Sequence, residues 1–247
     1  MRKAIRIIIA VIASVLIAFS AYKLITIYLD YKKGTDTYNE VASTVVTFTN
    51  EISTDDTDLP ITVDFDELKK INPDVIGWLY CKDTQINYPV VQTDNNEYYL
   101  HNMINGEYNF AGTLFVDYRC EKDFAGLNTI IYGHNMKNGS MFGDLPKYKA
   151  QDYYDAHPTM LLLTPDKTYK VELLSGQVTA SDSDAYDIIS KREDLTKYLE
   201  NAVSQSFFKT DSSVDDAEKI ITLSTCSYEY ENARFVVIGK LVEYNNE

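Results

Sequence analysis

The residue with the clearest chemical potential is a cysteine at the end of an apolar, β-branched run. The run Ile220–Cys226 has the composition of a β-strand, so its thiol would lie where the strand ends and a site can open. Arg234 follows after seven residues and opens a second run of the same kind, Phe235–Gly239. If the two runs form an antiparallel hairpin, Cys226 and Arg234 lie opposite each other at its open end.

This pairing would suit nucleophilic catalysis by a thiolate. A fixed cation beside the Cys226 thiol favours its ionised form, which is the nucleophile. The planar guanidinium of Arg234 also offers directed donors to the oxyanion that forms when a carbonyl is attacked. The alternative is that Cys226 is an inert buried thiol and that Arg234 is a solvated or surface-paired arginine.

A catalytic thiolate needs a proton-transfer partner, and the chain has three histidines. His134 comes after the strand-like run Asn128–Tyr132 and a glycine, so it would lie just beyond a strand end, within reach of a cleft. His101 lies in a polar turn context, and His157 precedes a proline. We therefore expect His134 to be the partner, the alternative being a solvated or core histidine.

The three cysteines, Cys81, Cys120 and Cys226, are too few and too scattered for a disulfide framework or a zinc site. An odd cysteine in an exported chain instead indicates a reactive thiol. A bridge between Cys81 and Cys120 stays open as an alternative. We expect no metal and no organic cofactor, because thiolate chemistry needs neither.

Residues 1–30 are predicted to anchor the chain in a membrane. The run Ile7–Leu29 is apolar apart from Lys23 and is long enough to span a bilayer as a helix. The positive-inside rule then places the N-terminus in the cytoplasm and the rest of the chain outside, as a single-pass protein. The alternative is a signal peptide cleaved near Ala18-Phe19-Ser20, and either interpretation exports the domain. The basic residues of the N-terminal head are Arg2, Lys3 and Arg6.

The rest of the chain is predicted to form a stalk and a catalytic domain. In residues 31–62 we expect an extracellular stalk with a helix from Tyr38 to Ile52, packed loosely on the domain, before the breaker-rich stretch Ser53–Asp58. Residues 63–247 would form the catalytic domain. The formal net charge of −14 argues against nucleic acid as a partner, since phosphate binding needs a concentrated basic face.

Short apolar or alternating runs between turn signals predict about eight strands in a mixed, mostly antiparallel barrel or sandwich. Two amphipathic helices are expected, at Phe65–Ile71 and, before the cysteine strand, at Arg192–Ser206. The predicted strands are Val75–Tyr80, Ile86–Val91, Gly112–Val116, Thr129–Tyr132, Met160–Thr164, Thr168–Ser175, Ile220–Ser224 and Phe235–Val242.

Several segments, in order, resemble the class B branch of the sortases, the cell-wall cysteine transpeptidases of Gram-positive bacteria. Thr222–Cys226 with Arg234 is similar to the TLxTC…R signature, and Ile131–Met136 with Gly139–Phe142 resembles the histidine segment. Cys120 departs from the pattern, because a polar residue is expected there. Further similar segments are Asn72–Leu79, Tyr88–Gln92, Asp117–Arg119 and the late helix, so the resemblance spans Phe65 to Val242.

The resemblance implies a closed, largely antiparallel eight-stranded sortase-type β-barrel with N-terminal helices and a late helix. It implies that Cys226 attacks a threonine carbonyl in an NPxTx-like sorting motif of a secreted protein, assisted by His134 and Arg234, and that an amine of a peptidoglycan precursor then takes the acyl group. The alternatives are an exported cysteine protease or amidase that transfers the acyl group to water, and a non-catalytic anchored binding domain. The residues implied to line the sorting-signal groove are Asn96, Leu100, Tyr132, Ser224 and Thr225.

Overall fold

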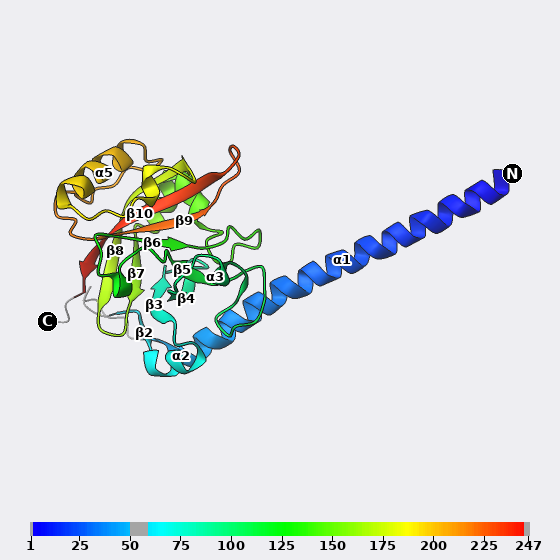
Figure 1. Ribbon diagram of the computed structural model, residues 1–247, viewed down its shortest axis with the longest axis horizontal. Coiled ribbons are helices and arrows are strands. Elements are labelled where there is room, and N and C mark those ends of the chain that lie inside the picture. The colour runs from blue at the N-terminus through cyan, green and yellow to red at the C-terminus, as the bar shows by residue number, and fades with distance from the viewer. Residues whose placement is uncertain (1, 50–58, 245–247) are drawn as a thin grey trace.

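The computed structural model describes residues 2–49 and 59–244, which form an eight-stranded barrel and a long helix that extends from it (Figure 1). The barrel strands are β3 (Val75–Tyr80), β4 (Asn87–Val91), β5 (Leu114–Val116), β6 (Asn128–Tyr132), β7 (Thr159–Leu163), β8 (Thr168–Ala180), β9 (Ile220–Cys226) and β10 (Ala233–Glu243). They close in the order β10-β8-β7-β3-β4-β5-β6-β9, with β9 paired to β10. The predicted closed barrel is therefore confirmed.

Two of the strand pairs in the barrel are parallel. They are β4 with β5 and β6 with β9, whereas the other neighbours pair antiparallel. A parallel pair needs a long crossover, and the connection from β6 to β9 contains β7, β8 and several helices. Because the two strands of a parallel pair end at the same edge, the segments that follow β6 and β9 emerge from the barrel together.

Strand β9 is buried along almost its whole length, which explains why its sequence is apolar without strict alternation. Ile221 and Leu223 pack in the main core with residues from the other strands. Ile220 packs on the opposite side, in a second cluster with residues of the late helix. The strand that carries the thiol is therefore held from both faces.

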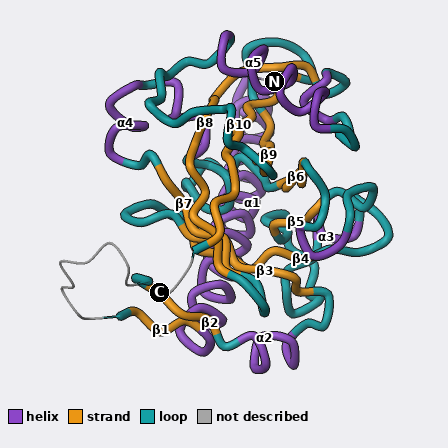
Figure 2. The backbone as a smooth tube through the Cα atoms, turned by 90° about the vertical axis from the view of Figure 1, so that its left-hand side faces the viewer, coloured by secondary structure: helices purple, strands orange, loops and turns teal. Residues whose placement is uncertain are grey.

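Helix α5 (Arg192–Ser204) covers the outside of the barrel over β8, β9 and β10 (Figures 1 and 2). Its apolar residues recur at helical spacing and pack onto Ile220 and Ile238. The helix ends two residues earlier than predicted, because the Ser206 hydroxyl accepts a hydrogen bond from the Gly176 N–H at 3.1 Å and so anchors the following loop to β8.

Apart from the long N-terminal helix, the remaining helices are short. Helix α2 (Phe65–Ile71) has its predicted bounds: the Asp64 side chain accepts from the Glu67 N–H at 2.9 Å at its start, and Asn72-Pro73 ends it. The others are α3 (Tyr98–His101), α4 (Gln151–Ala156) and the 3₁₀ helices η1 (Lys122–Phe124), η2 (Leu145–Lys149) and η3 (Asp184–Tyr186).

Helix α1 (Arg2–Val45) is continuous and ends earlier than the predicted helix at Tyr38–Ile52. The β-branched residues that follow favour an extended chain. Strand β1 (Val46–Phe48) accordingly pairs with β2 (Ile61–Val63) in a small antiparallel sheet. Residues 50–58, with the predicted breaker-rich stretch and the end of the predicted helix, lie outside the described residues.

The last turns of α1 pack closely on the domain instead of loosely. Tyr38, Val41 and Val45 are each at most 6% exposed and belong to the main core. The first part of α1 projects away from the barrel (Figure 1). Its most apolar 18-residue window has a mean hydropathy of 2.5, and none of it is buried in the protein. By length and composition this segment is able to cross a membrane, although a signal sequence has the same properties.

Candidate active site

A pocket of about 220 Å³ lies at the end of the barrel where β6 and β9 finish. All eight residues that the sequence singled out as catalytic or substrate-binding line it, together with Phe115 and Gly133. The lining residues are Asn96, Leu100, Phe115, Tyr132, Gly133, His134, Ser224, Thr225, Cys226 and Arg234.

Cys226 and Arg234 are paired directly across the β9–β10 ladder, as the spacing predicted. The ladder is closed beyond them by the Ser227 N–H, which donates to the Ala233 carbonyl at 3.0 Å. The same carbonyl accepts from Nη1 of Arg234 at 3.1 Å and holds the guanidinium at the pocket. Both side chains are partly exposed, so a substrate carbonyl is able to reach the thiol and the cation together.

His134 reaches the same place through the parallel pairing of β6 with β9. In this ladder Tyr132 is paired with Ser224, so two residues further on His134 comes level with Cys226. The Gly133 N–H extends the ladder by donating to the Ser224 carbonyl at 3.1 Å. Strand register therefore brings the imidazole and the thiol to one end of the barrel.

The residues on both sides of His134 are tied to the end of β9. Thr225 Oγ1 donates to the Gly133 carbonyl at 2.8 Å, and Asn135 Nδ2 donates to the Cys226 carbonyl at 2.8 Å. A Cβ at position 133 would lie 2.4 Å from a side-chain carbon of β5, so only glycine fits there without a shift. This close packing leaves the histidine loop little freedom to move away from the thiol.

The His134 ring is held by one backbone carbonyl. Its Nε2 lies 2.8 Å from the Leu100 carbonyl oxygen, and since a carbonyl only accepts, Nε2 carries a proton in this contact. In the neutral imidazole Nδ1 is then the nitrogen that is free to take up a proton.

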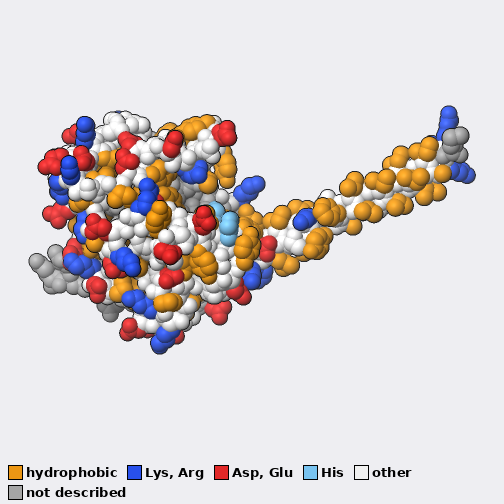
Figure 3. All heavy atoms as spheres, in the orientation of Figure 1, with side chains coloured by type: hydrophobic (Ala, Val, Ile, Leu, Met, Phe, Trp, Pro, Cys, Tyr) orange, Lys and Arg blue, Asp and Glu red, His pale blue; other side chains and the backbone are white. Residues whose placement is uncertain are grey.

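Burial lowers the pKa of His134; the bond to Leu100 opposes this shift, and the neighbouring His101 adds to it. The His101 ring is stacked on the His134 ring with 6.1 Å between centroids. In Figure 3 histidine side chains gather on the face of the domain near the point where α1 leaves it.

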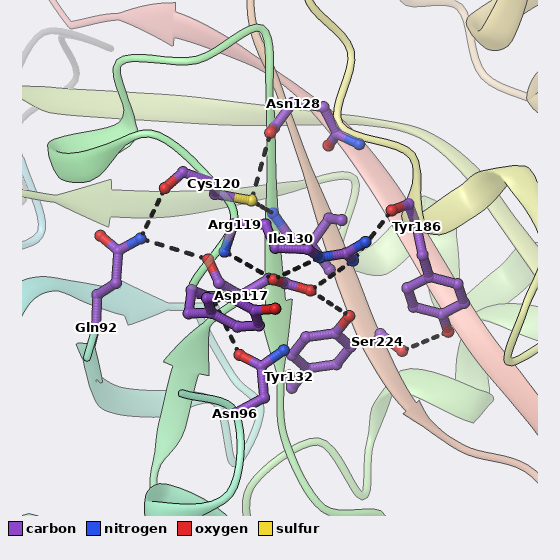
Figure 4. Close-up of polar contacts among 11 residues, drawn as sticks. Gln92, Asn96, Asp117, Arg119, Cys120, Asn128, Ile130, Tyr132, Tyr186 and Ser224 are labelled. Carbon is purple, nitrogen blue, oxygen red and sulfur yellow. Dashed lines mark hydrogen bonds and ion pairs between the residues drawn. The ribbon is translucent and has the colours of Figure 1, made fainter. Parts of the chain in front are cut away.

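On the side of the pocket lined by Tyr132, the Tyr132 hydroxyl is held by an ion pair between the buried Asp117 and the exposed Arg119 (Figure 4). The buried Asp117 carboxylate accepts from Arg119 at 3.0 Å (Nε) and 2.8 Å (Nη2) and from the Tyr132 hydroxyl at 2.9 Å. Burial alone would raise the pKa of Asp117, but the hydrogen bonds from Arg119 and Tyr132 outweigh it and lower the pKa. Burial and this carboxylate both raise the pKa of Tyr132, so the phenol stays protonated and keeps donating.

Tyr186 supports two of the lining residues from behind, and the sequence did not assign it. Its ring stacks on Tyr132 with 6.0 Å between centroids, and its hydroxyl lies 2.8 Å from Ser224 Oγ (Figure 4). Its carbonyl accepts from Arg119 Nη2 at 3.2 Å. No local pattern around Tyr186 marks this position, whereas the acid–base spacing in Asp117-Tyr118-Arg119 is a signal from which the supporting ion pair could have been predicted.

Asn96 and Leu100 come from the crossover between β4 and β5. Asn96 Oδ1 accepts from the Tyr118 N–H at 3.0 Å, which ties this crossover to the segment after β5. Asn95 Oδ1 accepts from the Tyr98 N–H at 2.9 Å and so ties the preceding turn to the start of α3, the short helix that contains Leu100. These contacts help to hold the crossover that contains Leu100.

All three cysteines are free, so the possible Cys81–Cys120 bridge is absent. Cys81 and Cys120 are buried, which raises the pKa of both thiols, whereas Cys226 is partly exposed at the pocket. A buried neutral thiol reacts poorly, and Cys226 is therefore the thiol that is placed for chemistry. Within residues 2–49 and 59–244, no group of three or more His, Cys, Asp or Glu side chains is arranged as metal ligands.

Comparison with known proteins agrees with this architecture. Residues 79–242 match the sortase domain family. Sortase B of Listeria monocytogenes is 39% identical over 198 residues, which cover 79% of this chain and 80% of that protein. The crystal structure of sortase B from B. anthracis has a TM-score of 0.74 at 33% identity and covers 87% of this chain and 99% of that chain. A Staphylococcus aureus sortase B–substrate complex has a TM-score of 0.68 at 30% identity, covering 72% and 84%.

The barrel and these relatives define a cysteine transpeptidase that acts on sorting signals. The chain belongs to the sortase family, in its class B branch. The resemblance seen in the sequence is thereby confirmed.

The ion pair beneath the pocket wall leads to a stability prediction. Asp117→Asn should lower the free energy of unfolding at pH 7 by about 1–3 kcal/mol, because it removes charge-assisted hydrogen bonds from a buried carboxylate. The folded-state pKa of Asp117 lies below its unfolded value, so its contribution is present above the unfolded pKa and is lost as the pH falls through the folded one. Denaturant unfolding from pH 7 to pH 3 should show the difference between parent and variant shrinking.

Asp166→Asn is the matched control for this measurement, since Asp166 is exposed in a turn. It should leave the free energy of unfolding within about 0.5 kcal/mol of the parent value. Equal losses in the two variants would contradict the assigned role of Asp117.

Proposed function

We propose that this enzyme cleaves an NPxTx-like sorting motif near the C-terminus of secreted proteins after its threonine and joins the new carboxyl end to an amine of a peptidoglycan precursor. The observation that carries this proposal is the convergence of Cys226, His134 and Arg234 on one pocket at the end of the barrel. We assign Cys226 as nucleophile, His134 as proton-transfer residue and Arg234 as oxyanion stabiliser.

In the first half-reaction the Cys226 thiolate adds to the threonine carbonyl carbon. The charge that develops on the carbonyl oxygen is stabilised by the guanidinium of Arg234, which lies across the ladder from the sulfur. The scissile C–N bond then breaks, and the leaving amine takes a proton from the imidazolium form of His134, which received it when the Cys226 thiol became a thiolate. Because Nε2 is engaged with the Leu100 carbonyl, Nδ1 is the nitrogen that exchanges this proton.

In the second half-reaction an amine adds to the thioester carbon. His134, now neutral, takes a proton from this amine, a new amide bond forms, and the Cys226 thiolate leaves. The lowered pKa of His134 suits both steps, because it makes the imidazolium a stronger acid toward the leaving amine and keeps the neutral base available near neutral pH. No metal or organic cofactor takes part in either half-reaction.

We propose that Asn96, Leu100, Tyr132, Ser224 and Thr225 bind the sorting motif. Support comes from their common position along the pocket and from the apolar and amide character of this lining, which suits an uncharged peptide backbone with small side chains. The Staphylococcus aureus relative forms a substrate complex on the same fold.

We further propose that residues 1–30 anchor the enzyme as a single-pass membrane protein, with residues 31–62 as an extracellular stalk and residues 63–247 as the catalytic domain outside the cell. Three basic residues precede the apolar run, which contains no acidic residue. The apolar surface of α1 is unburied and needs a membrane or a similar cover.

Cys226→Ala should remove acyl transfer altogether. With an NPxTx pentapeptide, the intact mass of the parent protein should rise by the mass of the acyl fragment, and the variant should show no adduct and a cleavage rate lower by more than about a hundredfold. Cys120→Ala is the control, because that thiol is buried away from the pocket, and it should retain most of the activity. Peptide cleavage that persists unchanged in Cys226→Ala would rule the mechanism out.

The identity of the acceptor separates a transpeptidase from a cysteine protease or amidase. When triglycine is added to the parent enzyme and the pentapeptide, the ligated peptide should appear by mass spectrometry and increase with the triglycine concentration, because the amine competes with water for the thioester. A hydrolase would release only the free acid at every amine concentration. That outcome would overturn the proposed acceptor without affecting the role of Cys226.

A further inference from the structure

The domain end of α1 contacts residues 112 and 113, which pack on the segment that holds the imidazole of His134. Tyr38, on the last turns of α1, is 4% exposed, and its hydroxyl donates to the Gly112 carbonyl. The same hydroxyl lies 2.8 Å from Thr113 Oγ1, which is in turn 2.9 Å from the Asn102 carbonyl. A buried phenol with two polar partners is a specific contact, since a buried hydroxyl without them would cost free energy.

Two further contacts, from Gly112 to the Leu100 carbonyl and from that carbonyl to the imidazole, lead from these partners to His134. Gly112 has φ of 58°, and a Cβ on it would lie 2.4 Å from the Tyr99 carbonyl oxygen and 2.7 Å from that of Leu100. Its backbone therefore packs directly onto these two carbonyls. The Thr113 N–H donates to the Tyr99 carbonyl at 2.9 Å, while the Leu100 carbonyl accepts from Nε2 of His134.

Other contacts hold the same stretch, residues 107–113, against α1. The Tyr31 ring meets the Phe110 ring edge-on with 4.8 Å between centroids. Asn109 Nδ2 donates to the Asp30 carbonyl at 3.0 Å, and Lys33 lies 3.3 Å from the Glu107 carboxylate. Figures 1 and 2 show this end of α1 against the side of the barrel that carries α3 and β5. The Lys33–Glu107 contact is at the surface and the other two are partly buried, whereas the Tyr38 hydrogen bonds are fully buried.

We propose that Tyr38 is a positioning residue for His134, acting through Gly112 and Thr113 on the Leu100 carbonyl that binds the imidazole. This inference rests on the proposed role of His134 as the proton-transfer residue. Helix α1 would then influence catalysis, because the hydrogen bond between the Leu100 carbonyl and the imidazole depends on Tyr38, a residue of α1.

Tyr38→Phe removes the hydroxyl and keeps the ring in the core. The Gly112 carbonyl and the Thr113 hydroxyl lose a buried partner, so the Leu100 carbonyl is held less firmly and its bond to His134 weakens. With the pentapeptide we expect kcat to fall about 5- to 50-fold, because small displacements of a proton-transfer group slow the reaction steeply. KM should change less than twofold, since Tyr132, Ser224 and Thr225 keep their own contacts.

Tyr31→Phe is the matched control. It makes the same chemical change on the same helix, at a residue that touches the segment through its ring, and it should leave kcat within twofold of the parent value. Thr113→Val, which removes the other hydroxyl of the pair, should reproduce the kcat loss of Tyr38→Phe. All variants are measured on the full chain in detergent micelles, and thermal unfolding is used to confirm that each is folded.

A second readout does not depend on turnover. In histidine-labelled protein, NMR should show that Tyr38→Phe reduces the population of the Nε2-protonated tautomer of His134 and lowers its pKa, because the Leu100 bond that opposes the lowering is weakened. The other ionisable groups near this ring, His101, Cys226 and Arg234, are the same in all the variants. Tyr31→Phe should leave the His134 signals unchanged.

Two results would count against the proposals in different ways. If Tyr38→Phe and Tyr31→Phe give the same kcat and the same His134 spectrum, Tyr38 has no positioning role. If His134→Gln cleaves the pentapeptide as fast as the parent enzyme, the proposed proton-transfer role of His134 is wrong. In that case the NMR comparison still decides whether Tyr38 orients the His134 ring.

Discussion

The constraint on which the rest of the site depends is the parallel pairing of β6 with β9. It sets Tyr132 against Ser224, and from this register the loop after β6 meets the end of the thiol strand. The antiparallel pairing of β9 with β10 then adds Arg234 from the other side. Three functional groups, two from the ends of β9 and β10 and one from the loop after β6, thus meet at one end of the barrel. A shift of one residue in the β6–β9 register would turn the side chains of one strand to the opposite face relative to the other.

The site keeps its shape because most polar groups around it have partners of their own. The histidine loop is bonded to β9 on both sides of the imidazole, and the ring itself is held by the Leu100 carbonyl. On the side of the pocket lined by Tyr132, the buried Asp117 carboxylate accepts hydrogen bonds from both Arg119 and Tyr132. Such buried polar networks are costly when incomplete and rigid when complete. The thiol is left partly exposed among these fixed groups, where a substrate is able to approach it.

Much of this arrangement could be predicted from the sequence, because it depends on local patterns. The strand-like runs around Cys226 and Arg234, and the short connection between them, indicated a hairpin in which the two residues are opposed. The residue at which α1 ends could not be predicted from the sequence. Helix-favouring and β-branched residues are mixed there, and the helix ends where β1 begins to pair with β2. Tyr186 and Tyr38 were missed for a related reason. Their roles come from contacts between segments far apart in the chain, and neither residue type nor spacing reveals such contacts.

The measurement that tests the central claim most directly is the alkylation rate of each cysteine in the folded protein. A short pulse of iodoacetamide followed by peptide mass spectrometry would report Cys81, Cys120 and Cys226 side by side. We expect rapid labelling of Cys226 alone, and protection of that cysteine by a saturating sorting-motif peptide, because only this thiol is partly exposed and lines a pocket together with a guanidinium and an imidazole. Labelling of Cys226 no faster than that of the two buried thiols would contradict it.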